Sequence, residues 1–462
     1  MFKAYPKRVL WLAALAFIAI ILISFFKAAL ELEDAEQAYY SQWWRLGYDD
    51  QPPLYTWLQI IMTKVFGVSR FALAGQRAIF FASTLLLMYR FAHQMLNDKK
   101  LAEISVWSMA LIIVFIDFNF RRLSHTSMMC ALVLATLVIT DRLLHSENLK
   151  NYILLGITLG LGMLTKYNFA IFITSLLVAA LLTRKTRLIV FNPKIIISLV
   201  LCMILFAPHG YWLLSEQAYI IEIQNQVNDK ANITEKDSML IVPQLWEMTK
   251  RLLIFWAPLL TVLFLGYLSK HITFKNVAKK DWFFYLLWVQ VIFLTILFAA
   301  LKVENIEERW LLPLMLPFVV FIIRYIDIAS IETLSRIGFI VFLTAIGIQT
   351  IRTPIEKMLS ISSAVHYSFD PIVNVLETKP KAKQWVLPDV TSAGGVYFIR
   401  PHREVISMDD FTLPEESIDS SNAIFIFKTK NNKLQNTVLF DSIIDFGDDH
   451  EDYFFYMTKN AQ

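Results

Sequence analysis

The feature that most constrains this chain is a series of apolar runs, each long enough or nearly long enough to cross a lipid bilayer. A helix needs about 20 apolar residues to span the hydrocarbon layer. Eleven segments meet or approach this length: residues 9–29, 71–96, 104–119, 126–144, 152–165, 168–183, 195–214, 252–269, 282–301, 310–325 and 336–352. The shorter ones indicate tilted or partly sunken helices packed on their neighbours. The sequence therefore predicts a polytopic α-helical membrane protein with about 11 transmembrane helices.

The composition supports this class and excludes others. Hydrophobic residues make up 56% of the 462 and charged residues only 18%, whereas a soluble domain is about a quarter charged. A net charge of +4, without a compact basic patch and binding motif, argues against nucleic acid as a partner. Cys130 and Cys202 lie inside apolar runs, so we interpret them as small buried hydrophobic residues.

The positions of lysine and arginine predict the orientation in the membrane. Cytoplasmic loops carry an excess of these residues. With the N-terminus inside, the inner loops hold Lys3, Lys7, Arg8, Lys99, Lys100, Arg142, Lys150, Arg184, Lys185, Arg187, Lys194, Lys270, Lys275, Lys279, Lys280, Arg324 and Arg336. Five cations lie at outer helix ends against this bias: Arg121, Arg122, Lys166, Lys302 and Arg309. We interpret that departure as a sign of function.

Two domains are predicted. Residues 1–352 form the transmembrane domain, with a first outer loop at 30–70 in which Leu54–Phe66 is a helix at the membrane interface. Residues 353–462 are more polar and contain the strand-like runs "QWVLP", "GVYFI" and "NAIFIFKT" between turn residues. We predict a small α/β domain there, outside the membrane.

The first outer loop concentrates negative charge next to the bilayer. The stretch "LELEDAEQAYYSQWWRLGYDDQPPLYTWLQ" contains six carboxylates and one cation. Charged groups near the bilayer are costly and often mark function. Glu33 and Asp34 lie within a turn or two of the end of the first span, where a carboxylate can act as a general base.

The outer cations complement these acids. Lys166 lies where a short helical hairpin turns, Arg309 opens the tenth span, and Arg121 and Arg122 flank the third and fourth spans. One carboxylate cluster and several isolated cations on the same side would supply a base for an acceptor and a clamp for a departing phosphate. This pattern favours transfer from a phosphate-bearing lipid.

The motifs "EDAEQAYYSQWWRLGYDDQPPLYTWLQ", "GLGMLTKYN" and "ERWLLPLMLP" resemble the GT-C superfamily of polyprenyl-phosphate-sugar-dependent glycosyltransferases, and within it the lipid A aminoarabinose transferases and dolichyl-phosphate-mannose protein mannosyltransferase-like enzymes. The resemblance extends from the first span to the tenth. It implies a catalytic acid at Asp34 or Glu33. The family has the two acids in the reverse order, which leaves the choice open, and we favour Asp34.

The resemblance also implies the other roles at the site. Lys166 and Arg309 would contact the donor phosphate, together with the flanking Arg121 and Arg122. His125, with Tyr167, would support the acceptor or a metal ion. The family's outer soluble domain corresponds to residues 353–462.

The implied activity is that of a membrane glycosyltransferase. It would move a hexose or pentose, with inversion, from a polyprenyl-phosphate donor to lipid A, lipopolysaccharide or another envelope glycan. The protein would lie in a bacterial inner membrane with the C-terminal domain in the periplasm. A divalent cation such as magnesium or manganese is a candidate cofactor. No nucleotide is expected, because "GITLGLG" lacks the strand context of a nucleotide-binding loop and its glycines favour close helix packing.

Three alternatives stay open at this stage. A lipid or glycan transporter should carry paired charges near the bilayer midplane and broken helices in related halves, which we do not find. A membrane scaffold that binds through its outer domain would leave the charges on one side unexplained. A different outer-leaflet glycan enzyme, such as a ligase or polymerase, is closer to the leading interpretation.

Overall fold

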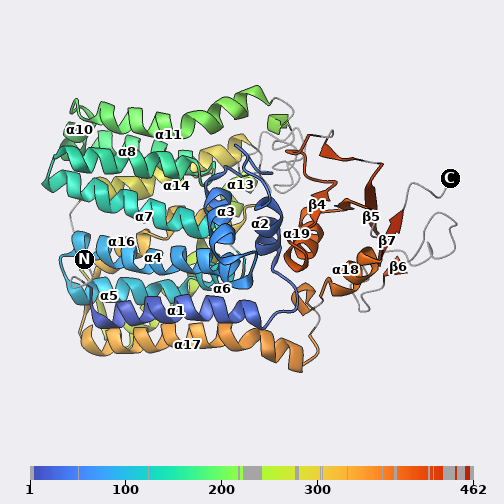
Figure 1. The fold of residues 1–462 in the computed structure, drawn as a ribbon. Helices are drawn as coiled ribbons and strands as arrows, with labels where there is room; N and C mark the ends of the chain where they lie inside the picture. The colour runs from blue at the N-terminus through green and yellow to red at the C-terminus, as the bar shows by residue number, and fades with distance from the viewer. Residues whose placement is uncertain are drawn as a thin grey trace. The chain divides into compact units, whose positions relative to one another are not determined.

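Figure 1 shows the protein as a computed structural model. It describes residues 5–49, 51–122, 124–216, 219–221, 242–275, 280–301, 303, 305–329, 331–361, 363–366, 368–378, 382–414, 417–419, 421–429, 443–444 and 453–457. Lys3, Lys279 and Lys302 lie outside these described residues.

Seven helices of the described chain are long and apolar enough to cross a membrane. They are α1 (Lys7–Phe25), α4 (Arg70–Leu96), α7 (Ser124–His145), α11 (Ile195–Ser215), α13 (Val242–Leu268), α14 (Trp282–Ala300) and α17 (Ile331–Met358). Two bent pairs raise the count to nine if each is one span. The first joins α5 (Lys99–Ser108) and the short helix Met109–Leu111 to α6 (Ile113–Arg121) at 72°, and the second joins α9 (Phe169–Leu182) to α10 (Arg184–Val190) at 120°.

The predicted count of eleven spans is not confirmed. Helices lie at all eleven predicted positions, but α8 (Leu149–Met163) has only 15 residues, about 22 Å at the rise of an α-helix. The predicted tenth span consists of α15 (Glu308–Met315) and α16 (Phe318–Arg324). The third bends at Ile112, whose backbone is extended (φ −94°, ψ 96°). Apolar composition alone does not reveal such breaks.

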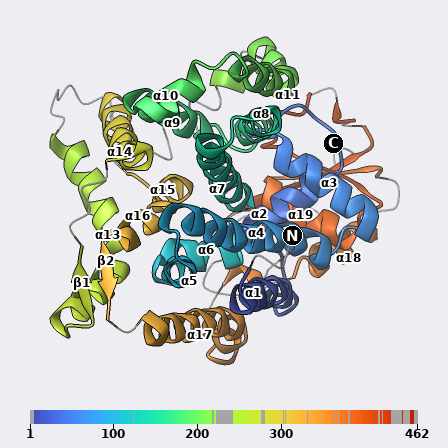
Figure 2. The same ribbon diagram turned by 90° about the vertical axis from the view of Figure 1, so that its left-hand side faces the viewer.

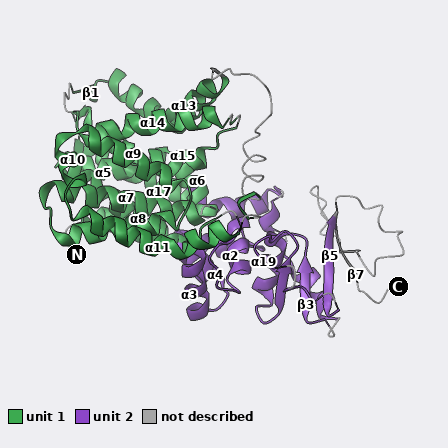
Figure 3. Ribbon diagram, turned by 90° about the horizontal axis from the view of Figure 1, so that it is seen from above, with its two compact units in different colours: residues 1–17, 50–54, 77–347 green, residues 18–49, 55–76, 348–462 purple. Residues whose placement is uncertain are grey.

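The chain divides into two compact units, coloured separately in Figure 3. One unit comprises residues 1–17, 50–54 and 77–347, and the other comprises residues 18–49, 55–76 and 348–462. We call them the helical unit and the mixed unit. Most of the first outer loop thus shares a unit with the C-terminal residues, although the two are far apart in sequence. The domain boundary at residue 352 stays a prediction.

Figure 2 shows the helical unit as a bundle of helices. Small residues allow some of these helices to pack closely. Helix α8 packs on α11, and a Cβ added at Gly156 would lie 2.6 Å from the carbonyl oxygen of Ser198. A Cβ at Gly160 would lie 2.9 Å from Leu205. These are glycines of "GITLGLG", so their predicted packing role is confirmed. Two short antiparallel strands, β1 (Ile272–Phe274) and β2 (Ile326–Ile328), also belong to this unit.

The mixed unit contains a five-stranded sheet in the order β4-β3-β5-β7-β6. Its strands are β3 (Gln384–Leu387), β4 (Glu404–Ser407), β5 (Ala423–Thr429), β6 (Ile443–Ile444) and β7 (Tyr453–Met457). Strand β3 runs parallel to β4 and β5, while β7 is antiparallel to β5 and β6. The helices α18 (Asp370–Glu377) and α19 (Val390–Ile399) and a short helix at Ala364–His366 complete this segment.

Two of the three strand predictions are confirmed and one is wrong. "QWVLP" contains β3 and "NAIFIFKT" contains β5, but "GVYFI" is the second half of helix α19. Parallel strands such as β3 and β4 need a crossover connection, which α19 supplies. Asp389 caps this helix by accepting a hydrogen bond from the Ser392 N–H at 2.7 Å. Short apolar runs do not distinguish a buried strand from a buried helix.

The first outer loop shares a hydrophobic core with this sheet. Helix α2 (Leu32–Tyr40) contributes Tyr39 and Tyr40, and α3 (Leu54–Phe66) contributes Ile60. The same cluster contains Ile372 of α18 and Trp385 of β3, all nearly fully buried. Helix Leu54–Phe66 has the bounds that the sequence predicts, while its place at a membrane interface stays a prediction.

Candidate active site

The two predicted catalytic acids lie in the first turn of α2, in the mixed unit. Carboxylates are favoured there because the amino end of a helix carries partial positive charge. Asp34 is buried, with 3% of its surface exposed, whereas Glu33 is partly exposed. A buried carboxylate is shielded from bulk water, which strengthens its interactions with a nearby proton donor. Burial therefore favours Asp34 between the two.

Two cations that sequence reasoning missed surround the start of α2. Lys27 and Glu31 form a buried ion pair at 2.7 Å. Arg70 donates to the carbonyl oxygens of Ser24 and Ala28, both at 2.7 Å, and is within Coulomb range of Asp34. Both residues are tied to the turn between α1 and α2, and this turn sets the position of Asp34. The spacing of four residues between Lys27 and Glu31 was a signal in the sequence.

The other end of α2 is joined to the sheet through Asp410. The Tyr39 hydroxyl donates to Asp410 at 2.8 Å, and Arg45 Nη1 donates to the same oxygen at 2.7 Å. The Ser407 N–H donates to the Tyr39 oxygen at 3.1 Å. Burial, and next the Asp410 carboxylate, raise the pKa of Tyr39 far above its ordinary value, so this phenol stays a proton donor even in alkaline solution. Nothing in the sequence signals a contact over this separation.

The predicted cationic residues lie in the helical unit, where Lys166 follows α8 in the turn leading to α9. Its ammonium group donates to the Thr126 hydroxyl at 3.1 Å. His125 Nδ1 lies 3.3 Å from the carbonyl oxygen of Thr165. The turn therefore lies against the first residues of α7, and the structure brings Lys166 and His125 together.

Arg309 lies in the first turn of α15, beside the same turn. The side chain of Asn168 donates to the carbonyl oxygen of Trp310 at 3.4 Å, which joins the Lys166 turn to the start of α15. Arg309 is about one-third exposed and forms an ion pair with Glu307. The start of α15 and the Lys166 turn are thus neighbours, as the predicted phosphate clamp requires.

Arg121 and Arg122 differ in environment. Arg121 ends α6 and is buried, whereas Arg122, the next residue, is exposed. Helix α6 packs against α15, which carries Arg309, and precedes α7, which carries His125. Burial of a guanidinium group is costly without partners. The Arg121 side chain is therefore enclosed by the protein, whereas the Arg122 side chain is exposed at the surface.

Tyr167 belongs to an aromatic cluster that sequence reasoning missed. Its hydroxyl lies 3.3 Å from His209 Nε2 and 3.3 Å from the Tyr219 hydroxyl. His209 is fully buried in α11, and Trp212 packs edge-on against Tyr219 with ring centroids 4.4 Å apart. A histidine inside the apolar run "FAPHGYW" was the available signal. The contacts direct the Tyr167 side chain to α11 and hold it there.

The described residues contain no group of three or more histidine, cysteine, aspartate or glutamate side chains close enough to hold a metal ion. The residues that the structure describes thus do not form a metal site around Asp34 or His125, and we derive no step through a metal.

The arrangement has two parts. Cationic side chains on the elements around the Lys166 turn can bind a phosphate group, and a buried carboxylate on α2 can accept a proton. The acids and the cations belong to different compact units. Their meeting in one pocket stays a prediction.

Comparisons with known proteins show what the chain is similar to. The family described as dolichyl-phosphate-mannose-protein mannosyltransferase matches residues 50–212. The structure of ArnT from Cupriavidus metallidurans bound to undecaprenyl phosphate shares the fold, with a TM-score of 0.61 and 10% identity over 98% of each chain. Together with the apolar helices, these matches show an integral membrane protein with the GT-C fold.

Two curated proteins of Rhizobium johnstonii are similar in sequence. The lipopolysaccharide core galacturonosyltransferase RgtB is 28% identical over 313 residues, which are 66% of this chain and 62% of the relative. The lipopolysaccharide core galacturonosyltransferase RgtA is 28% identical over 210 residues, which are 46% of this chain and 42% of the relative. The match thus spans less than two thirds of the length of either relative.

Proposed function

We propose that this protein is a membrane glycosyltransferase that moves a sugar from a polyprenyl-phosphate donor to an envelope glycan. The observation that carries the proposal is the meeting of three elements at Lys166, where the turn after α8 contacts the starts of α7 and α15. The matched family region includes Lys166, His125, Arg121 at the end of α6 and the following Arg122. The fold neighbour binds undecaprenyl phosphate, which supports a lipid-phosphate donor.

The proposed reaction assigns a role to each group. A hydroxyl oxygen of the acceptor attacks the anomeric carbon of the sugar and loses its proton to the Asp34 carboxylate. The bond between that carbon and the phosphate oxygen breaks, and polyprenyl phosphate leaves with the bonding electrons. Lys166 and Arg309, with Arg121 and Arg122, stabilise the negative charge on the departing phosphate. Attack opposite the leaving group inverts the configuration at the anomeric carbon.

The acceptor that we propose is lipopolysaccharide. Both curated relatives are named lipopolysaccharide core galacturonosyltransferases, so galacturonic acid on the core is the first sugar and acceptor to test. Such an acceptor would be met at the outer face of a bacterial inner membrane. This agrees with the orientation that the lysine and arginine positions predict, with the N-terminus in the cytoplasm and the C-terminal domain in the periplasm.

The experiment compares envelope lipids of cells with and without this protein by mass spectrometry. The lipopolysaccharide of cells that carry the protein should contain one additional sugar residue, and incubation of membranes with the synthetic polyprenyl-phosphate sugar should add the same mass. Unchanged lipopolysaccharide with accumulated lipid-linked sugar would instead indicate a transporter.

Variants test the assigned roles in the same assay. Asp34→Asn should lower the transfer rate by about 10²- to 10⁴-fold because the proton acceptor is lost, and Glu33→Gln should have a smaller effect. Lys166→Ala should raise the donor concentration needed for half-maximal rate. The matched controls are Glu404→Gln and Lys150→Ala, both at exposed positions, which should leave transfer unchanged. An active Asp34→Asn enzyme would remove Asp34 from the mechanism.

A further inference from the structure

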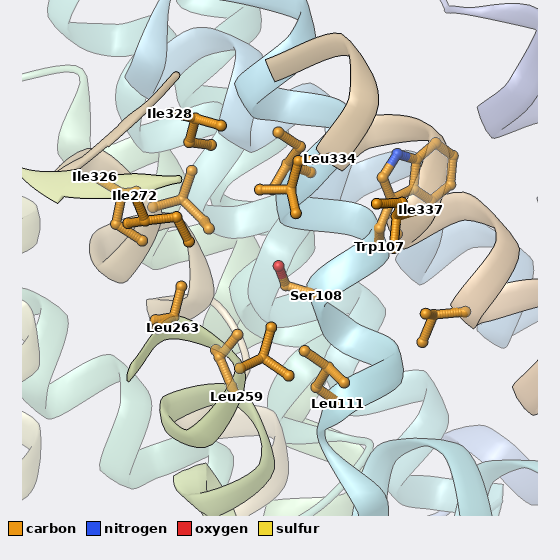
Figure 4. Close-up of a pocket in the computed structure, with 15 residues that line it drawn as sticks. Trp107, Ser108, Leu111, Leu259, Leu263, Ile272, Ile326, Ile328, Leu334 and Ile337 are labelled. Atoms are coloured by element: carbon orange, nitrogen blue, oxygen red, sulfur yellow. The ribbon is translucent and has the colours of Figure 1, made fainter. Parts of the chain in front are cut away.

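A second candidate binding site lies in the helical unit, lined by none of the residues assigned to the reaction. It is a cavity of about 100 Å³ between α5, α13, α16, α17 and the two short strands (Figure 4). A space of this size holds more than one water molecule, but an apolar cavity gains little from hydration. Ser108 is the one lining residue with a hydroxyl, amide or charged side chain.

The walls of this cavity are almost entirely aliphatic. Leu259 and Leu263 of α13 form one side, and Ile272 of β1 lies beside them, opposite Trp107 and Ile337. The one other polar atom, the Trp107 indole N–H, donates to the Ser335 hydroxyl at 3.2 Å. The lining therefore has little to offer a polar ligand, and a flexible hydrocarbon chain fits it best.

Part of the cavity lining is exposed at the surface of the helical unit. The lining residues Val262, Ile337 and Val341 are 41%, 51% and 39% exposed. They lie on α13 and α17, both long and apolar enough to cross a membrane. Exposed aliphatic side chains on such helices face the hydrocarbon of the bilayer. A lipid chain can thus enter from the side without crossing water.

A charged network lies at the end of the wall formed by α5 and α17. From Trp107, the hydrogen bonds continue from the Ser335 hydroxyl to the buried Glu103 at 2.8 Å. Lys100 then bridges Glu103 at 3.4 Å and Glu332 at 2.9 Å. The ion pairs of Glu332 extend to Arg8 at 3.7 Å and Arg336 at 3.4 Å. Trp107, which lines the apolar cavity, is thus connected to the partly exposed charge cluster through hydrogen bonds and ion pairs.

The cations of this cluster outnumber the exposed acids. Arg8 and Lys100 are each 36% exposed at the side chain and Arg336 is 66% exposed, against 46% for Glu332. Lys99 is exposed as well, and Glu103 is buried. A basic group of side chains beside a gap between membrane helices suits an anionic headgroup. The sequence places these cations in predicted inner loops, where the leaflet is rich in anionic lipid.

We propose that this cavity holds one acyl chain of an anionic glycerophospholipid, with its phosphate at the cluster of Arg8, Lys99, Lys100 and Arg336. The bound lipid would fill a void between α5, α13 and α17 and so stabilise the bundle. This inference does not rest on the proposed function, because none of these residues belongs to the proposed reaction.

The test uses the full-length protein in phosphatidylcholine nanodiscs that contain a small fraction of phosphatidylglycerol with a diazirine at the end of one acyl chain. After illumination and digestion, mass spectrometry should locate the cross-links on the lining residues of α5, α13 and α17. Unlabelled phosphatidylglycerol should compete with the probe, and added phosphatidylcholine should not. Cross-links spread evenly over all lipid-facing helices would overturn the proposal.

A matched pair of variants makes the test specific. Leu263→Trp fills the cavity and should lower cross-linking there by about tenfold, a loss of about 1.4 kcal/mol in binding. Leu265→Trp makes the same change at a position 58% exposed on the same helix and should leave labelling unchanged. Equal labelling of both variants would contradict the proposal.

Two further measurements on this system address the headgroup and the donor lipid. Arg336→Gln should reduce the preference for phosphatidylglycerol over phosphatidylcholine. An unchanged preference would refute the headgroup assignment. Added polyprenyl phosphate should not displace the probe. If it does so at equal concentration, the cavity binds the tail of the sugar donor, and the phospholipid assignment is wrong. These measurements use the wild-type protein or a surface variant, so none depends on Leu263→Trp folding.

Discussion

At the scale of single residues, Asp410 fixes the carboxyl end of helix α2 to the segment that follows β4. Its carboxylate is fully buried and accepts hydrogen bonds from Tyr39 and Arg45, two residues of the first outer loop. It also accepts a hydrogen bond from the Thr412 hydroxyl at 2.6 Å. A buried charge is stable only when paired and hydrogen-bonded, and here one aspartate satisfies both conditions. Asp34, the proposed proton acceptor, lies on the same short helix as Tyr39.

We predict that Asp410→Ala destabilises the protein by about 3–5 kcal/mol, because it leaves the Arg45 guanidinium, 12% exposed at the side chain, without its carboxylate partner. The measurement is thermal unfolding of the detergent-purified protein, followed by tryptophan fluorescence. Glu377→Ala is the control, because it removes one side of an ion pair with Arg400 in which both side chains are about 40% exposed. Its effect should be small, since exposed pairs are screened by water. Equal effects of the two variants would contradict the structural role of Asp410.

At the scale of elements, the close approach of α2 and α19 unites the first loop with the C-terminal sheet. A Cβ added at Gly394 of α19 would lie 1.8 Å from the carbonyl oxygen of Ala35 in α2, which no side chain can tolerate. The two helices can therefore meet only where one of them carries a glycine. The next residue, Gly395, is also closely packed, because a Cβ added there would lie 2.6 Å from the ring of Phe369. This packing positions the first turn of α2, and with it Asp34 and Glu33.

We predict that Gly394→Ala separates α2 from α19 and destabilises the protein by about 3 kcal/mol or more, since overpacking of this severity forces the backbone to move. The measurement is again the unfolding midpoint in detergent, together with the transfer rate. The control is Gly347→Ala in α17, where a Cβ would meet nothing within 4 Å. That change should stabilise the helix by about 0.5–1 kcal/mol. A Gly394→Ala protein as stable as the control would show that the two helices can separate at little cost.

At the scale of the whole molecule, the protein shares its fold with ArnT despite little sequence identity. The ArnT structure aligns over 98% of the chain at 10% identity. A helical bundle of this kind requires apolar and small residues at particular positions, and many different sequences meet this requirement. The fold therefore supports the class, while the chemistry depends on a few charged side chains at particular helix ends.

The predicted orientation is tested by fusion of reporters. Alkaline phosphatase fused after the C-terminus should be active, because it folds only after export, and green fluorescent protein at the same place should be dark. A fusion after Lys275, in a predicted inner loop, should give the opposite result. Active phosphatase at both positions would invalidate the assignment of inner and outer loops.

The amino-acid sequence by itself determined that the protein is a helical membrane protein, and it supplied the residues of the proposed reaction, whose roles stay predictions. These properties depend on local pattern: runs of apolar residues, cations at helix ends and a carboxylate pair after the first span. Such patterns involve neighbouring residues, because a helix is formed by contacts three and four positions apart. The sequence thus predicts Lys166 and His125 in one site, and in the structure Lys166 contacts Thr126 while His125 contacts Thr165.

Only the tertiary structure decided how these elements combine. It placed "GVYFI" in a helix instead of a strand, divided the predicted third span at Ile112, and joined α2 to Asp410 across more than 360 residues. The helix at "GVYFI" depends on the crossover between two parallel strands, and the contact of α2 with Asp410 depends on a charge buried beside one tyrosine. No local spacing encodes such partners, since the same short segment is stable in several conformations until its neighbours select one.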